Sequence, residues 1–171
     1  ALTCLKCGQA RPTGVARVNP TQVGVVVAGM MGAGRASARA STCIATVLKV
    51  VSQYKADAGK AYSARITEAR VAQGRMSADA QAALLARITT TGQVADLAGC
   101  ELIIEAVFER RDLKAQVTQE AEPLLAADGF FASNTSTLPI AGLATASTRP
   151  GKFIGIHFFS PVDKMQLVEI I

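Results

Sequence analysis

Short, continuously apolar runs alternate along this chain with longer stretches in which polar and apolar residues are mixed. The run VGVVV (23–27) is too short for a buried helix and is rich in β-branched residues, which is typical of a strand covered on both faces of a sheet. The same reasoning predicts further strands over 44–51, 101–107, 129–134, 153–159 and 166–171. The mixed stretches predict helices over 32–42, from Gln53 to Gln73 before Gly74, over SADAQAALLARI behind a Ser77 cap, and from Asp112 to about Leu125.

Strands that alternate with helices indicate an α/β fold, in which a mostly parallel, doubly wound sheet of the Rossmann type has helices on both faces. Residues 1–22 are rich in Gly, Pro, Arg and Thr without apolar periodicity, so we expect a linker segment there. Residues 23–171 then form one dinucleotide-binding domain. In such sheets ligands bind at the carboxyl ends of the strands, so the informative residues are those that follow the strands.

The first strand runs into a glycine-rich turn, VVVAGMMGAG (25–34). Gly29 and Gly32 occupy the second and third glycine positions of a G-x-G-x-x-G fingerprint, which bring backbone amides and a helix N-terminus to a phosphate. Val27 stands at the first glycine position, where a β-branched side chain disfavours the tight turn. A glycine-rich turn without a ligand therefore stays open as the alternative.

A dinucleotide site also needs an acceptor for the ribose hydroxyls about 20 residues further on. That position is Val50, which offers no polar atom. Ser52 or Gln53 is a weak substitute acceptor. Lys49 and Lys55 lie nearby and leave a 2′-phosphate, and hence NADP, open as an alternative to NAD.

His157, the only histidine of the chain, ends an apolar run; Ser136 precedes it by 21 residues and Glu169 follows it by 12. A histidine that moves a proton to or from a substrate hydroxyl benefits from a carboxylate that fixes its tautomer and a hydroxyl that shares the substrate oxygen. The alternatives are a buried structural histidine beside a turn, or a serine hydrolase. The second would need a glycine-flanked serine, which NTSTL lacks.

Composition narrows the class further. Half of the 171 residues are hydrophobic and 18% are charged, which suits a globular core, and no apolar run approaches the roughly 20 residues of a membrane helix. The net charge of +5 is dispersed, so we expect no nucleic-acid partner. Four cysteines are too few for a disulfide scaffold, so we expect free thiols and a cytoplasmic protein. Cys4 and Cys7 form a C-x-x-C, but no second pair follows at a suitable spacing, so we expect no metal.

Six segments together carry a more specific signal: AGMMGAG, GKAYS, LAGCELIIEAVFE, LKAQV, FASNTSTLPI and FIGIHFFSPVDKMQLVEII. They resemble the NAD-binding domain of the 3-hydroxyacyl-CoA dehydrogenases, as found in the multifunctional enzymes of fatty-acid β-oxidation, over about residues 22–171. The resemblance implies oxidation of an L-3-hydroxyacyl-CoA with NAD as hydride acceptor. It also implies an acyl-CoA partner and a helical C-terminal domain that is absent from this sequence, through which such enzymes form homodimers or multienzyme complexes.

By resemblance, His157 is the catalytic base, Glu169 its paired carboxylate and Ser136 a contact to substrate and nicotinamide. The cofactor-binding positions implied are Gly29, Met31, Gly32, Val50, Val107, Phe108, Glu109, Lys114, Ser136 and Ser160. Val27 and Val50 depart from the family pattern, which has a glycine and an aspartate there. Because both lie in the first β-α-β unit, the alternative function is a degenerate, non-catalytic module with weakened cofactor binding.

Overall fold

The computed structural model describes residues 18–27, 44–50, 53–159 and 168–171. Several predictions concern positions outside these ranges: the glycine-loop residues Gly29, Met31 and Gly32, the helix over 32–42, Ser160, and Cys4 and Cys7. The side chain of Lys55 lies outside the described set as well.

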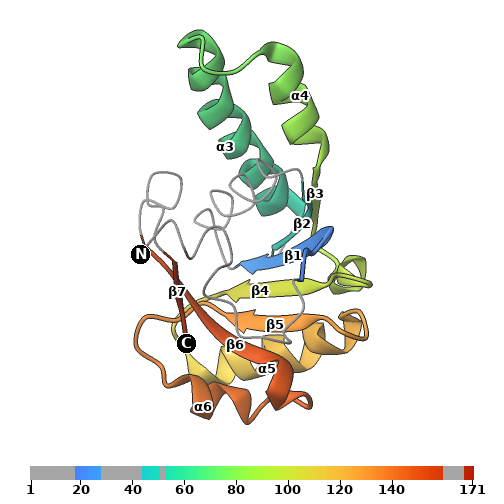
Figure 1. Ribbon diagram of the computed structural model, residues 1–171, viewed down its shortest axis with the longest axis vertical. Helices are drawn as coiled ribbons and strands as arrows, with labels where there is room; N and C mark the ends of the chain where they lie inside the picture. Colours follow the sequence, from blue (N-terminus) through green and yellow to red (C-terminus); the bar gives the residue numbers. More distant parts are fainter. Residues whose placement is uncertain (1–17, 28–43, 51–52, 160–167) are drawn as a thin grey trace.

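Seven strands form one sheet in the order β3-β2-β1-β4-β5-β6-β7 (Figure 1). The first six in this order are parallel, and β7 pairs antiparallel with β6 at one edge. The strands are β1 Gln22–Val27, β2 Ala45–Val50, β3 Ile88–Thr91, β4 Leu102–Ala106, β5 Phe130–Ser133, β6 Phe153–Phe158 and β7 Val168–Ile170. Strand order reverses between β1 and β4, as in Rossmann folds, so a ligand crevice is expected beyond the carboxyl ends of these two strands.

The helices are α3 Gln53–Ala72, α4 Ala78–Ala86, α5 Arg111–Ala121 and α6 Ile140–Ala144, with short 3₁₀ turns η1 Val94–Leu97, η2 Glu122–Leu124 and η3 Pro150–Lys152. The predicted limits between α3 and α4 are confirmed. Gly74 adopts a left-handed φ of 67° just after α3, and the Ser77 hydroxyl accepts a hydrogen bond from the Ala80 N–H at 3.1 Å. In Figure 1 these two helices extend away from the sheet as a hairpin.

Two local predictions were wrong, and one short helix was missed. Ile88, expected to end the second helix, instead begins β3, because Ile88 and three following threonines are β-branched and Ile88 is fully buried beside β2. The helix expected to reach Leu125 ends at Ala121, since Pro123 has no amide hydrogen for an α-helical bond and the chain turns into η2. The short helix α6 was not predicted.

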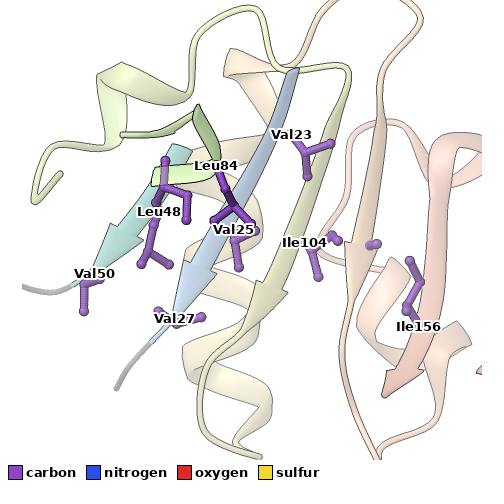
Figure 2. Packing of buried hydrophobic residues seen from close by; sticks show 10 residues of the cluster. Val23, Val25, Val27, Leu48, Val50, Leu84, Ile104 and Ile156 are labelled. Carbon is purple, nitrogen blue, oxygen red and sulfur yellow. The ribbon is translucent and has the colours of Figure 1, made fainter. Parts of the chain in front are cut away.

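The two faces of the sheet carry separate hydrophobic clusters. Figure 2 shows the first, in which Val25 and Leu48 meet Leu84 of α4. On the other face, Phe131 stacks on Phe153 with ring centroids 5.6 Å apart, and Leu143 of α6 and Ala121 of α5 cover them. Helices thus cover both faces of a mostly parallel sheet, so the predicted fold class is confirmed.

Among the helices in the described part of the chain, none combines the length and the apolar character that a bilayer span requires.

Candidate active site

The strand ends of β4, β5 and β6 carry the polar groups that the sequence singled out. Glu109 lies three residues beyond β4, Ser136 three residues beyond β5, and His157 within the last two residues of β6. Because these strands are parallel neighbours, their carboxyl ends meet at one edge of the sheet. Three segments far apart in sequence therefore form one site.

His157 lies between a hydroxyl and a carboxylate. Its Nε2 is 3.3 Å from the Ser136 Oγ, and its Nδ1 is 3.2 Å from an oxygen of Glu169. The antiparallel pairing of β7 places Glu169 directly opposite His157 in the register. A carboxylate at Nδ1 favours the tautomer with the proton on Nδ1, which leaves Nε2 as an acceptor for the serine hydroxyl or for a substrate hydroxyl. The imidazole is 21% exposed, so a dissolved ligand can reach it.

Glu109 holds the loop that carries Ser136. One oxygen, Oε1, accepts hydrogen bonds from the Thr135 hydroxyl at 2.5 Å, the Ser136 N–H at 2.7 Å and the Thr137 N–H at 3.1 Å. Burial raises the pKa of Glu109, but the hydrogen bonds from Thr135, Ser136 and Thr137 and the charge of Lys114 outweigh it and lower the pKa below 4.5. Glu109 is therefore a carboxylate at neutral pH, and its side chain is 36% exposed.

A fully buried ion pair lies beneath this loop. The Lys114 Nζ donates to the two carboxylate oxygens of Glu105 at 2.9 and 3.1 Å and to the Asn134 carbonyl at 2.8 Å, and it lies 3.7 Å from Glu109. The side chain of Lys114 is 1% exposed. Its charge acts on the site through Glu109, because the ammonium is enclosed by protein groups.

The remaining predicted cofactor positions that the structure describes are apolar. Phe108 is 65% exposed beyond the end of β4, an unusual exposure for an aromatic ring and suitable for stacking against a flat ligand. Val107 is half-buried and donates its backbone N–H to Glu105. Val50 is 2% exposed, in register with Val27 and packed in the first hydrophobic cluster. It lies two strands away from β4 and offers no polar atom there.

The structure thus brings Ser136, His157, Glu169 and Glu109 together. It places Lys114 below them and Val50 apart from them. Sequence reasoning missed Glu105, although a carboxylate inside the apolar run ELIIEAV was a usable signal, since an ionised group in a buried strand requires a partner.

Sheet order and site together define a class: a Rossmann-type domain with an imidazole, held between a hydroxyl and a carboxylate, at the carboxyl ends of its strands. Comparison with known proteins gives the family. The family model described as "3-hydroxyacyl-CoA dehydrogenase, NAD binding domain" matches residues 22–171. The chain belongs to this family.

Individual relatives agree with this assignment. A probable 3-hydroxybutyryl-CoA dehydrogenase of Deinococcus radiodurans is 38% identical over 86% of this chain and 53% of its own length. The crystal structure of (S)-3-hydroxybutyryl-CoA dehydrogenase from Ralstonia eutropha superposes with a TM-score of 0.85 at 34% identity, covering 89% of this chain and 54% of that one. The dehydrogenase part of multifunctional enzyme 1 from C. elegans gives a TM-score of 0.79 at 25% identity, covering 92% of this chain and 36% of that one. The chain spans about half the length of the first two relatives.

The described residues fit NAD at one end of its expected site. At the ends of β4 and β5, a Glu109 oxygen, the Ser136 hydroxyl and the exposed Phe108 ring offer polar and stacking contacts. At the end of β2, the buried Val50 supplies none of the acceptors that a ribose requires. The donor set therefore suits the nicotinamide side of the cofactor better than the adenosine side.

Proposed function

We propose that this chain is the NAD-binding domain of an L-3-hydroxyacyl-CoA dehydrogenase of fatty-acid β-oxidation, with His157 as the base. The observation that carries the proposal is the alignment of Ser136, His157 and Glu169 through the two ring nitrogens, at 3.3 and 3.2 Å. The acyl-CoA substrate class follows from the family and from the names of its relatives. Within the family, NAD supplies the hydride acceptor.

The geometry supports the following roles. Nε2 of His157 takes the proton of the substrate 3-hydroxyl while the hydrogen on the same carbon leaves as hydride, so that the alcohol becomes a ketone and the proton passes on to solvent. The Glu169 carboxylate stabilises the imidazolium that forms, and the Ser136 hydroxyl shares the substrate oxygen. Glu109 keeps Ser136 in place. By the same proposal Gly29, Met31, Gly32, Val107, Phe108 and Ser160 line the cofactor.

The whole enzyme extends beyond this domain in our proposal. Residues 1–22 form a linker and residues 23–171 the cofactor domain, while a helical partner domain completes the acyl-CoA cleft and mediates a homodimer or a multifunctional complex. The share of its relatives that the chain covers, 53% and 54%, supports such a second part. We place the reaction in the cytoplasm, as the low cysteine content and the free, buried thiol of Cys100 suggest.

Two measurements test the proposal. Titration with NADH, followed by nicotinamide fluorescence, should saturate in the micromolar to millimolar range, and NADPH in the same titration tests for a 2′-phosphate site near Lys49. Reduction of acetoacetyl-CoA by NADH should proceed with the chain or with a longer form that includes the second domain, and His157→Asn should lower its rate by about 10²–10⁴-fold. No fluorescence change at millimolar NADH in either form would refute the proposal.

A second candidate function is a non-catalytic module of the same fold. The buried Val50 at the end of β2 favours it, because loss of one ribose acceptor weakens binding by about 1–3 kcal/mol, roughly tenfold to a hundredfold. The two candidates differ in the longer form: a dehydrogenase turns over acetoacetyl-CoA there, and a degenerate module does not.

A further inference from the structure

We propose that Glu105, through its ion pair with Lys114, is a positioning residue that fixes the orientation of His157. The inference rests on the proposed role of His157 as the base, but the contacts that support it are those of the buried Glu105–Lys114 pair. Among the contacts described for Glu105, none is to the three residues assigned to proton transfer.

The first observation is the place of Glu105 in the sheet. Glu105 is in register with Ser133 of β5, and Ser133 is in register with Gly155 of β6. These three residues form one row across the sheet. His157 lies two residues beyond Gly155 on the same face, on the order of 7 Å further along β6. Glu105 and His157 therefore lie on the same face of the sheet, and the row of Glu105 comes two residues before that of His157 along the strands.

The second observation is that the Glu105 carboxylate joins the ends of two strands, β4 and β5, to helix α5. Its carboxylate accepts hydrogen bonds from the Val107 N–H at 2.7 Å, which sets the turn after β4, and from the Ser133 hydroxyl at 2.7 Å, which sets the end of β5. It also holds the Lys114 ammonium, which donates to the Asn134 carbonyl.

Asn134 extends the connection to β6. Its amide N–H donates to the Glu105 carbonyl at 2.7 Å, and its side-chain Oδ1 accepts the N–H of Phe158 at 3.2 Å. Phe158 is the residue next to His157. The buried carboxylate is thus linked to the backbone beside the imidazole through Lys114 and Asn134, which is hydrogen-bonded at both its carbonyl and its side chain. The same Asn134 precedes the loop that carries Ser136.

Stability alone does not account for such a pair. A buried ion pair costs desolvation of two charges, and a well-packed apolar pair of similar volume is often equally stable. Another buried carboxylate of this domain, Glu122, shows the contrast. It is 2% exposed and satisfied by the Ser147 and Thr148 hydroxyls and the Thr148 N–H, away from the site. Glu122 thus holds a loop through hydrogen bonds alone, and no cation is among the contacts described for its carboxylate.

The test uses the fact that His157 is the only histidine of the chain. In a tag-free protein labelled with ¹⁵N-histidine, the Nδ1 and Nε2 resonances report the ratio of its two neutral tautomers at about pH 8.5, where the imidazole is ordinarily unprotonated. The variants are Glu105→Gln/Lys114→Met, which removes the pair without leaving a lone buried charge, and the milder Ser133→Ala, which removes one donor to Glu105. Glu122→Gln and Ser147→Ala are the matched controls.

We expect the double variant to remain folded and to change the tautomer ratio by roughly two- to tenfold, the equivalent of losing one hydrogen bond to Nε2. Ser133→Ala should change the ratio in the same direction by less. The two controls should shift the urea midpoint downward and leave the imidazole resonances in place. Unchanged resonances in the folded double variant, or equal changes in the controls, would overturn the proposal; if the double variant does not fold, Ser133→Ala against Ser147→Ala decides.

This readout needs neither cofactor nor turnover. A chain without dehydrogenase activity whose imidazole still responds to Glu105 would refute the proposed function and leave the positioning role standing.

Discussion

Replacement of Glu109 by glutamine removes the charge that holds the Ser136 loop while preserving the shape of the side chain. One carboxylate oxygen accepts three hydrogen bonds of 3.1 Å or less. Hydrogen bonds to a charged group contribute about 1.5–3 kcal/mol each when buried, but this group is 36% exposed and glutamine retains one acceptor oxygen. After discounting for solvent screening, we expect a total loss of about 1–2 kcal/mol at neutral pH.

The pH dependence makes this prediction specific. The pKa of Glu109 is lower in the folded protein than its ordinary 4.5, so its contribution is fully present above about pH 5 and is lost as the pH falls through the folded-state pKa. The difference in unfolding free energy between the wild type and Glu109→Gln should therefore be largest near neutral pH and shrink toward about pH 3. Urea denaturation at several pH values measures it.

A matched control is Glu120→Gln, which makes the same chemical change on the exposed face of α5, where the carboxylate contacts Gln116. It should cost less than about 0.5 kcal/mol at any of these pH values. A difference for Glu109→Gln that stays constant between about pH 7 and pH 3 would refute the reasoning, because the charge would then not be what holds the loop.

Three further predictions follow from the site and the fold. His157→Asn should lower turnover by about 10²–10⁴-fold while the NADH dissociation constant stays within about twofold, as steady-state kinetics and fluorescence titration would show. Gly74→Ala should lower the free energy of unfolding by about 1–2 kcal/mol in urea denaturation, because the φ of 67° is strained for alanine although no atom obstructs its methyl group. Gly151→Ala, which is also unobstructed and has no positive φ, should lower it by less than half as much. Val50→Asp should lower stability by about 1–3 kcal/mol because it buries a carboxylate, yet tighten NADH binding roughly tenfold or more; unchanged affinity would contradict the assignment of β2 to the adenosine side.

Much of the sheet could be predicted because its strands are short, β-branched and apolar. β1 and β2 differ from the predicted ranges by only one residue at some ends. β3 escaped prediction because ITTT is only half apolar and follows a helix directly, so that its burial depends on pairing with β2. Such pairing is a property of the tertiary structure.

The site, too, could be predicted only in part. Ser136, His157 and Glu169 were found from residue type and resemblance, and the structure brings the three together. The burial of Lys114 could not be predicted, because a lysine on a helix is ordinarily exposed and only the position of Glu105 in the neighbouring strand makes its burial tolerable.

The antiparallel strand β7 determines how the contact between Glu169 and His157 is lost on heating. It is three exposed residues long, and among the described strands it pairs only with β6, at the outer edge of the sheet. Edge strands of this kind detach in local opening events that leave the rest of a domain folded, and amide hydrogen exchange detects such events. Because Glu169 is carried by this strand, each opening removes the carboxylate from His157 while the parallel core persists. Under the proposed function, heat should therefore inactivate proton transfer at His157 well below the temperature at which the sheet itself unfolds.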